Sequence, residues 1–398
     1  KFSFDRVMDP ETKSPNRKEV MSFVKEVKVL DDHTIQFLLK YPTPVFLYSC
    51  TRPRPVAIVS QKAVEKYGKD FARNPIGSGP FMLESFSRDQ IVLVANKNYH
   101  EGPPRFDRVV YKMIPDNDTL LMALLKGDIH MVHSISRDKA ILDRLFKGGG
   151  KLQVIDKGTY HQLHLNPRYK PLEDIRVRRA VAHGIDRDAI IEYVTTKMGT
   201  KLNSPVPKGY WGHNEEGLRR YDYDPKKAKE LLAEAGYGNG FEVTLDTFQS
   251  PTYLPVAIAI QGQLEKVGIK VNLGVKDQNT WMANLSGGHS QMSLLFPTRH
   301  PDAHFPLVDF FSSAGFSPGL NLARYDKVDK EIEVASKEMD PQKRQKIYDE
   351  VQKRIMEDLP VIPLFMLPHP CAHSPKITGF PSVDFVWGYD FYNLRLVE

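Results

Sequence analysis

The chain has 398 residues, of which 41% are hydrophobic, 10% aromatic and 26% charged, and its formal net charge is +6. This length exceeds what one hydrophobic core usually serves, and the ordinary globular composition excludes a largely disordered chain. The basic residues are spread along the chain, so they indicate a solvated surface with a mild preference for anions, and no apolar run is long enough to cross a membrane.

The N-terminal part predicts short elements separated by prolines. Residues 1–9 predict an amphipathic helix that is already under way at the first residue, so we expect a processed chain or missing upstream residues. Residues 23–41 predict a β-hairpin, because two alternating runs flank a two-residue turn. Prolines then break residues 42–55, and residues 61–68 predict a short helix that ends at a glycine.

Residues 74–81, NPIGSGPF, raise the question of a phosphate-binding loop. Such a loop needs a helix whose N-terminus faces the anion, and usually a lysine. Here no lysine follows, and the next residues alternate between apolar and polar as strands do. We therefore predict a tight turn between two elements.

The rest of the chain predicts strands and helices in alternation. Residues 81–115 predict three strands, and helices are expected over residues 117–132, within 169–198, after Asp224 and after Asp340. Residues 241–297 alternate between strand and helix patterns, which favours a parallel or mixed sheet.

No motif of a known catalytic set is present, since neither HExxH nor GxSxG occurs and the thirteen histidines are scattered. Cys50 and Cys371 are compatible with one disulfide or with two buried thiols, and we expect the second. His130 and His133 could share a helix face and bind a metal, but a solvated helix end is the favoured interpretation. We therefore predict a protein without cofactor or bound metal, and not an enzyme.

Polar residues follow the predicted strand that ends near Pro297. Arg299, His300 and Asp302 lie in this loop, and loops at the carboxyl ends of strands are where α/β proteins bind ligands. Arginine and histidine there could hold a carboxylate, and His300 with His304 could meet a metal chelate. A plain surface loop is the equal alternative.

Two other features are candidates for ligand contacts. Arg52 lies in TRPRP, where stiff prolines restrict its direction, and arginine is the natural bidentate partner of a carboxylate. Trp211, Trp281 and Trp387 lie at predicted loops or element ends, where aromatic rings can stack on a ligand. A surface charge and packing at a domain edge are the respective alternatives.

The chain resembles the large extracytoplasmic solute-binding proteins of ABC importers, in the branch that takes peptides, nickel and similar solutes. The resemblance covers nearly the whole chain and is carried by FSFDRVMDP, AVEKYG, NPIGSGPF, FDRVVYKMIPDNDTLLMALLKGDIHMV, LEDIRVRRAVAHGIDRDAII, YDYDPKKAKELLAEAGY, QLEKVGIKV and DPQKRQKIYDEVQKRIMEDLPVIPLF. It implies an α/β, two-lobed periplasmic-binding-protein fold of type II with an extra subdomain, whose first lobe lacks its N-terminal part here.

The resemblance also implies a discontinuous domain organisation. Residues 1–75 are expected to be the remnant of the accessory subdomain of lobe 1, and residues 76–166 to be lobe 1 itself. Residues 167–363 are expected to form lobe 2, and residues 364–398 to return to lobe 1. The ligand would be enclosed between the lobes, which close by a hinge motion.

By this resemblance the protein is a monomeric, non-catalytic receptor in the bacterial periplasm, or anchored outside the cytoplasm, that delivers a small solute to an ABC permease. The implied solute is peptide-like or carboxylate-bearing. Asp302 could correspond to the aspartate with which the dipeptide branch holds a ligand amine, and Arg52 to an arginine of the nickel-chelate branch. The expected ligand-binding residues are Arg52, Trp281, Arg299, His300, Asp302 and Trp387.

Three alternatives stay open at this point. One is a nickel-chelate or other metal-chelate receptor of the same family. Another is a sensor or regulatory module that reuses the fold without transport. The third is an enzyme of two α/β lobes, which would need a convergent acid, base or nucleophile set.

Overall fold

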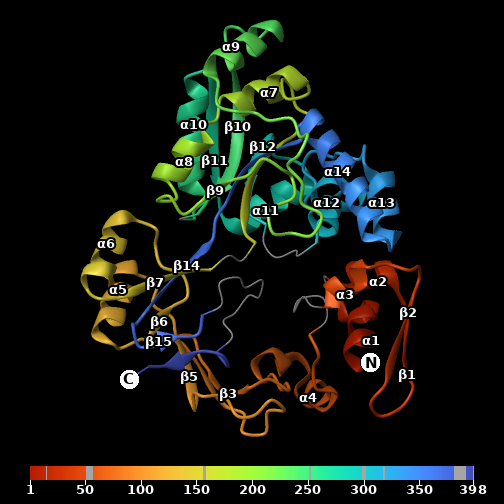
Figure 1. Cartoon of the computed structure of the whole chain (residues 1–398), viewed down its shortest axis with the longest axis vertical. Helices are drawn as coiled ribbons and strands as arrows, with labels where there is room; N and C mark the ends of the chain where they lie inside the picture. The colour runs from red at the N-terminus through yellow and green to blue at the C-terminus, as the bar shows by residue number, and fades with distance from the viewer. Residues whose placement is uncertain are drawn as a thin grey trace. The chain divides into compact units, whose positions relative to one another are not determined.

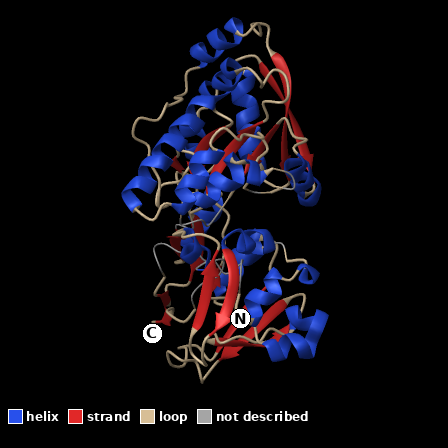
Figure 2. Cartoon of the chain, turned by 90° about the vertical axis from the view of Figure 1, so that its right-hand side faces the viewer, coloured by secondary structure: helices blue, strands red, loops and turns tan. Residues whose placement is uncertain are grey.

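The computed structural model describes residues 1–14, 16–50, 57–155, 158–250, 252–297, 302–316, 319–380 and 391–397. The chain forms two compact units, which we name unit 1 (Lys1–Ile155 with Pro370–Glu398) and unit 2 (Asp156–His369) (Figure 1). Both units mix helices and strands (Figure 2). The predicted boundaries at residues 75, 166 and 363 stay a prediction, while the compact units divide at residues 155 and 369.

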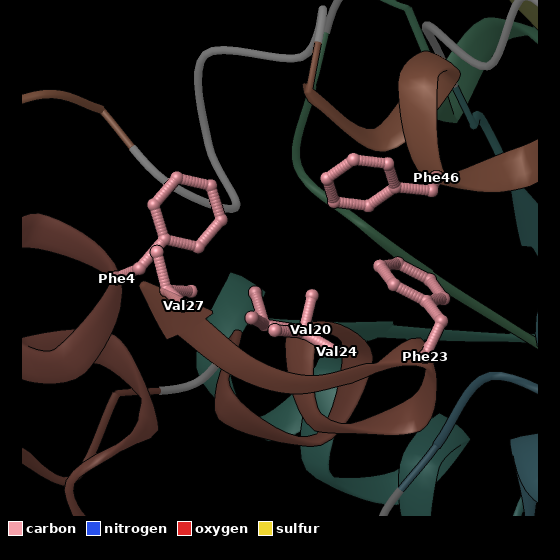
Figure 3. Packing of buried hydrophobic residues seen from close by; sticks show 6 residues of the cluster. All are labelled: Phe4, Val20, Phe23, Val24, Val27 and Phe46. Atoms are coloured by element: carbon pink, nitrogen blue, oxygen red, sulfur yellow. The ribbon is translucent and has the colours of Figure 1, made fainter. Parts of the chain in front are cut away.

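Unit 1 begins with a small helical layer on a hairpin. Its elements are α1 (Phe2–Met8), η1 (Pro10–Thr12), α2 (Arg17–Phe23), β1 (Val24–Val29), β2 (Ile35–Leu39) and α3 (Val45–Cys50). The antiparallel pairing of β1 with β2 confirms the predicted hairpin. Figure 3 shows the core that holds this region together, made of Phe4, Val20, Phe23, Val24, Val27 and Phe46.

A three-stranded antiparallel sheet follows in unit 1. Its elements are α4 (Gln61–Tyr67), η2 (Gly68–Arg73), β3 (Phe81–Phe86), β4 (Gln90–Ala95) and β5 (Arg108–Lys112), in the sheet order β3-β4-β5. Residues 74–80 lead into a strand, so the helix N-terminus that a phosphate-binding loop needs is not there. The amide side chain of Asn96 donates to the carbonyl of Gly79 and fixes this segment, which confirms the predicted turn.

The remainder of unit 1 combines two distant parts of the sequence. Its elements are α5 (Asn117–Lys126), β6 (Met131–Val132), α6 (Lys139–Lys147), β7 (Lys151–Ile155), β14 (His369–His373), β15 (Ile377–Thr378) and β16 (Arg395–Leu396). In the sheet β6-β14-β7, strand β14 lies between two strands that precede it by more than 200 residues in the sequence. Cys371 on β14 is buried, Cys50 is exposed and the two do not form a disulfide, so the expectation of two buried thiols is wrong for Cys50.

Unit 2 is built on a six-stranded mixed sheet in the order β11-β10-β12-β8-β13-β9. Its strands are β8 (Tyr160–Leu165), β9 (Thr200–Lys201), β10 (Phe241–Phe248), β11 (Ile269–Lys276), β12 (Met292–Leu295) and β13 (Val361–Met366). Its helices are α7 (Ile175–His183), α8 (Arg187–Tyr193), α9 (Pro225–Glu234), α10 (Leu254–Glu265), α11 (Gln278–Gly287), α12 (His304–Phe311), η3 (Ser313–Gly315), α13 (Asp329–Lys337) and α14 (Pro341–Asp358). The parallel pairing of β10 with β11 and β12 confirms the predicted α/β stretch.

Local sequence signals explain where the helices of unit 2 begin. The carboxylate of Asp224 accepts from two backbone amides at the start of α9, and Asp340 does the same for α14. In both helices proline occupies the first position, where its missing amide hydrogen costs no hydrogen bond. The predicted Asp-Pro helix starts are therefore confirmed.

A buried arginine connects α8 to the loops and the sheet around it. The guanidinium of Arg187 is 5% exposed and donates to the carbonyls of Leu202, Tyr221 and Pro363. Because buried carbonyls require hydrogen-bond donors, the arginine of the GIDRDAII segment has a structural role.

Two glycines of the α/β stretch should respond in opposite directions to alanine. Gly240 has a φ of +82°, and a Cβ there would lie 2.1 Å from the carbonyl oxygen of Gly268. We expect Gly240→Ala to lower the free energy of unfolding by about 2 kcal/mol or more, through the strained backbone and this contact. Gly262 lies exposed within α10 with open space around it, so Gly262→Ala should raise the free energy of unfolding by about 0.5–1 kcal/mol. Urea denaturation measures both, and a shift in the same direction would contradict this account of the two sites.

Candidate functional site

One edge of the unit 2 sheet collects the ends of most of its strands. Strands β10, β11 and β12 are parallel, and β8 is antiparallel to both β12 and β13 (Figure 1). The carboxyl ends of β10, β11, β12 and β13 therefore lie at the edge where β8 begins. Open α/β sheets bind ligands at the carboxyl ends of their strands, so we take this edge as the candidate site.

An aromatic cluster occupies this edge. We name it the aromatic edge cluster, and it consists of His161, Phe248, Tyr253, Trp281, Phe296 and Phe365. The His161 ring lies between Phe296 and Phe365, with centroid distances of 4.0 and 4.5 Å. The ring centroid of Tyr253, just before α10, lies 4.5 Å from that of Phe248 and 5.7 Å from that of Phe296. Tyr253 therefore connects the last residue of β10 with the residue that follows β12.

Burial divides the aromatic edge cluster into a supporting and an accessible part. His161 and Phe365 are fully buried, and Trp281 and Tyr253 are 1% and 9% exposed. Phe248 and Phe296 are partly exposed. Burial raises the pKa of Tyr253, whose hydroxyl accepts a hydrogen bond from the amide of Phe296, so the phenol is neutral. The accessible part is therefore two aromatic rings held by a buried frame.

The lysine at the end of β11 is already paired. Its ammonium lies 2.5 Å from a carboxylate oxygen of Asp246, and Ser290 donates to the other oxygen at 2.6 Å. Asp246 is buried within β10, so this pair anchors β11 to its neighbours. Lys276 is thus not a free cation for a ligand.

Trp281 was predicted as a ligand contact, and the structure places it inside the aromatic edge cluster. Its indole nitrogen donates to the hydroxyl of Ser293 at 3.1 Å, and its ring packs 4.8 Å from Phe248. With its side chain almost entirely buried, Trp281 supports Phe248 from behind. Direct contact of Trp281 with a solute stays a prediction.

Asp302 was predicted to hold a ligand amine, and the structure gives its carboxylate another partner. Both of its oxygens accept from the guanidinium of Arg344, at 2.8 and 2.7 Å, and one also accepts from the amide of His304. Asp302 is fully buried, and Arg344 also lies 4.3 Å from the centroid of Trp211. This arrangement links the start of α12 to α14 and gives Asp302 a structural role.

The remaining predicted ligand residues, Arg52, Arg299, His300 and Trp387, lie outside the described residues. The sequence analysis missed the other five members of the aromatic edge cluster, of which His161, Phe248 and Phe296 matter most for the site. A signal for two of them was available, since FQSPTY and LFP each place an aromatic residue at or directly after the end of a predicted strand. His161 gave no such signal, because its neighbours come from residues far along the chain.

A group of metal ligands and a membrane-spanning helix are both absent from the described residues. No group of three or more histidine, cysteine, aspartate or glutamate side chains within it could hold a metal ion, and this includes the surroundings of His130 and His133. Among the helices of the described residues, none has both the length and the apolar character needed to cross a bilayer.

An open depression of about 450 Å³ lies in unit 1 beside the segment before β3. Arg73, Ile76, Glu84 and Phe86 are among the residues that line it. None of the predicted ligand residues contributes to it, and it is not at the carboxyl ends of parallel strands, so it is the weaker candidate.

The chain is similar in sequence to a known family and to proteins of known ligand. The model of the family described as "Bacterial extracellular solute-binding proteins, family 5 Middle" matches residues 1–318. The glutathione-binding protein GsiB of Salmonella paratyphi A is 29% identical over 394 residues, which cover 96% of this chain and 76% of the relative.

Two solved structures are similar in fold as well as sequence. The periplasmic binding protein DppA from Helicobacter pylori, in complex with the peptide STSA, is 27% identical with a TM-score of 0.87 over 99% of this chain and 80% of DppA. MoaA from A. tumefaciens R10, in complex with mannopinic acid, is 27% identical with a TM-score of 0.86 over 100% of this chain and 82% of MoaA.

These similarities extend over nearly the whole chain and agree with its two compact α/β units. The chain has the two-lobed α/β fold of periplasmic solute-binding proteins. The relatives are solute-binding proteins rather than enzymes. Because the family model matches residues 1–318 of 398, the chain belongs to the family 5 bacterial extracellular solute-binding proteins.

Proposed function

We propose that this protein is the solute-binding receptor of an ABC importer and that it captures a peptide-like or other carboxylate-bearing solute outside the cytoplasm. The observation that carries the proposal is the match to glutathione-binding proteins over 96% of the chain. The aromatic edge cluster supports it, since small-molecule sites are largely apolar and aromatic with a few polar groups that fix orientation. We further propose that the receptor is periplasmic or anchored outside the cytoplasm, is monomeric and catalyses no reaction.

The acidic character of the solute is supported by the sequence and by the relatives. Glutathione, the peptide STSA and mannopinic acid, named with three of the similar proteins, all carry carboxyl groups. In this chain Arg52, Arg299 and His300 are the groups that we propose to bind a carboxylate. All three stay proposals because they lie outside the described residues.

The metal-chelate alternative finds less support in unit 2. It paired His300 with His304, but the ring nitrogen Nδ1 of His304 is buried within the unit. Desolvation also lowers the pKa of His304 to about 3, with a further contribution from the charge of Arg344, so the ring is neutral and this nitrogen is not exposed to an external ligand. The metal-chelate and sensor interpretations stay predictions from the resemblance alone.

Native mass spectrometry of the purified protein tests the proposed function directly. The expected result is one co-purified small molecule with at least one carboxyl group, released on denaturation. A chain that carries no small molecule and binds none from a panel of dipeptides would contradict the receptor role. A co-purified solute without an acidic group would contradict only its proposed chemistry.

Arginine substitutions test the carboxylate contacts. Hydrogen bonds to charged groups contribute roughly 1.5–3 kcal/mol each, so Arg52→Ala and Arg299→Ala should each weaken binding by about ten- to a hundredfold. Titration calorimetry with the co-purified solute measures the affinity, and thermal unfolding should be nearly unchanged. Arg88, exposed in the turn between β3 and β4, supplies the control Arg88→Ala, which should bind as the unmodified protein does. Unchanged affinity in both test variants would show that Arg52 and Arg299 are only surface charge.

A further inference from the structure

We infer that Phe248 and Phe296 form an aromatic platform that selects solutes carrying a planar aromatic group beside their carboxylate. This inference rests on the proposed solute-binding function and narrows its substrate class. It concerns the two partly exposed members of the aromatic edge cluster, and the four buried members serve as their support.

The platform is held in place before any solute arrives. The Phe248 ring packs 4.5 Å from Tyr253 and 4.8 Å from Trp281, and Trp281 is itself fixed by its hydrogen bond to Ser293. The Phe296 ring lies 4.0 Å from His161, which in turn packs on Phe365. Because these rings are already ordered, a solute that stacks on them loses little additional side-chain entropy.

The position of the two rings favours a ligand contact over simple packing. Phe248 is the last residue of β10 and Phe296 directly follows β12, so both lie at the carboxyl ends of neighbouring parallel strands. The supporting residues behind them are at most 9% exposed, whereas these two rings remain partly accessible. A rigid, partly exposed pair of aromatic rings at a strand-end site is suited to cover an apolar group of a bound molecule.

Two polar groups near the platform bring no unpaired charge to it. Tyr253 is a neutral phenol, and the nearest lysine along the strand ends, Lys276, is paired with Asp246. The platform thus offers rings without a competing charge. An aromatic group that stacks on such rings edge-to-face or offset gains binding free energy beyond the contribution of the apolar area that it buries. An aromatic group is therefore expected to bind better here than an aliphatic group of similar size.

The test compares three dipeptides on the whole chain by titration calorimetry. Phenylalanyl-alanine should bind on the order of fivefold tighter than leucyl-alanine and more than tenfold tighter than alanyl-alanine. Phe248→Ala and Phe296→Ala should each reduce the ratio of the affinity for phenylalanyl-alanine to that for leucyl-alanine by up to about fivefold. Phe248→Leu keeps an apolar side chain in place and should lose the preference over leucyl-alanine while it stays folded.

Phe241 supplies the matched control, because it begins the same strand β10 at the opposite edge of the sheet. Its ring is also partly exposed and also packs on one tyrosine, Tyr237, at 5.5 Å. Phe241→Ala should keep the full preference. Equal affinities of the unmodified protein for phenylalanyl-alanine and leucyl-alanine, or a preference that survives in Phe248→Leu, would overturn the platform while leaving the receptor role intact. If neither the dipeptides nor a co-purified solute binds, the receptor role and the platform are both overturned.

Discussion

Asp302→Asn is expected to lower the free energy of unfolding of unit 2 by about 3–5 kcal/mol, because it leaves the guanidinium of Arg344 buried without its counter-charge. The side chains of Asp302 and Arg344 are 0% and 3% exposed, and they share two hydrogen bonds of 2.7 and 2.8 Å. The asparagine side chain has a single, uncharged acceptor oxygen. Its NH2 group would face the N–H groups of the guanidinium, and both are donors. Arg344→Met should lower the free energy of unfolding by a similar amount, since it leaves the carboxylate of Asp302 buried without its counter-charge. Urea denaturation followed by circular dichroism measures both changes.

An exposed ion pair between α14 and the neighbouring helix α13 provides the control. Arg354 on α14 lies 3.4 Å from Glu331 on α13, and both side chains are more than 40% exposed. Arg354→Met should therefore change the free energy of unfolding by less than about 1 kcal/mol. The double variant Asp302→Asn with Arg344→Met should lose less than the sum of the two single losses, because no unpaired charge remains. Additive losses, or a loss below about 1 kcal/mol for Asp302→Asn, would show that the buried pair is not coupled.

The same pair shows why the site was harder to predict than the fold. In the sequence, Asp302 is an acidic residue in a polar loop after a strand, which is also the pattern of a ligand contact. Its partner Arg344 is 42 residues away, on the first turn of a helix whose other residues look like a solvated face. No local pattern connects the two residues, so only the three-dimensional structure could show that the carboxylate has an internal partner.

The elements that were predicted correctly depend on short-range chemistry. Asp224 and Asp340 are followed at once by proline and then by helix-forming residues, so the start of each helix is determined within four residues. The hairpin at β1 and β2 likewise needs only an alternating pattern and a turn. The sheet order of unit 2 has no such basis, because β8 and β13 are neighbours that lie about 200 residues apart in the sequence.

The aromatic edge cluster combines both situations. Phe248 ends one predicted strand and Phe296 follows another, so their positions at the sheet edge could have been predicted from the sequence. His161 and Phe365 lie on the neighbouring strands β8 and β13, and their contact depends on a register that local patterns do not determine. Sequence reasoning therefore located the edge through Trp281 and the loop after β12, but not the two rings that are accessible there.

Acidification should destabilise unit 2 well above the pH at which its carboxylates are protonated. His164 on β8 is fully buried, and His304 at the start of α12 is partly exposed but has its ring nitrogen Nδ1 buried. Desolvation lowers the pKa of each ring to about 3. His164 has only the side-chain oxygen of Gln162 as a neighbour for one nitrogen, at 3.1 Å, and Arg344 further disfavours a charge on His304. Both rings are therefore neutral in the folded state.

The sign of the effect follows from where each state binds protons. In the unfolded chain a histidine takes up a proton below about pH 6.5, whereas these two rings stay neutral in the folded state down to about pH 3. The unfolded state thus binds more protons across this window, so the free energy of unfolding falls as the pH falls. Each histidine contributes a slope of about 1.4 kcal/mol per pH unit, and the two together should remove on the order of 4–5 kcal/mol between pH 6.5 and 4.5.

Urea denaturation at a series of pH values from 7.5 to 4.5 measures this slope, and single substitutions assign it. His164→Gln and His304→Gln should each reduce the slope by about one proton per molecule, because glutamine does not titrate. His289 is exposed, so His289→Gln should leave the slope nearly unchanged. If the slope is flat between pH 6.5 and 4.5, or if all three variants reduce it equally, desolvation of His164 and His304 is not its cause. A slope that halves only in His164→Gln and His304→Gln would show that the strand at the centre of the sheet and the helix held by the Asp302–Arg344 pair unfold together, as one cooperative unit.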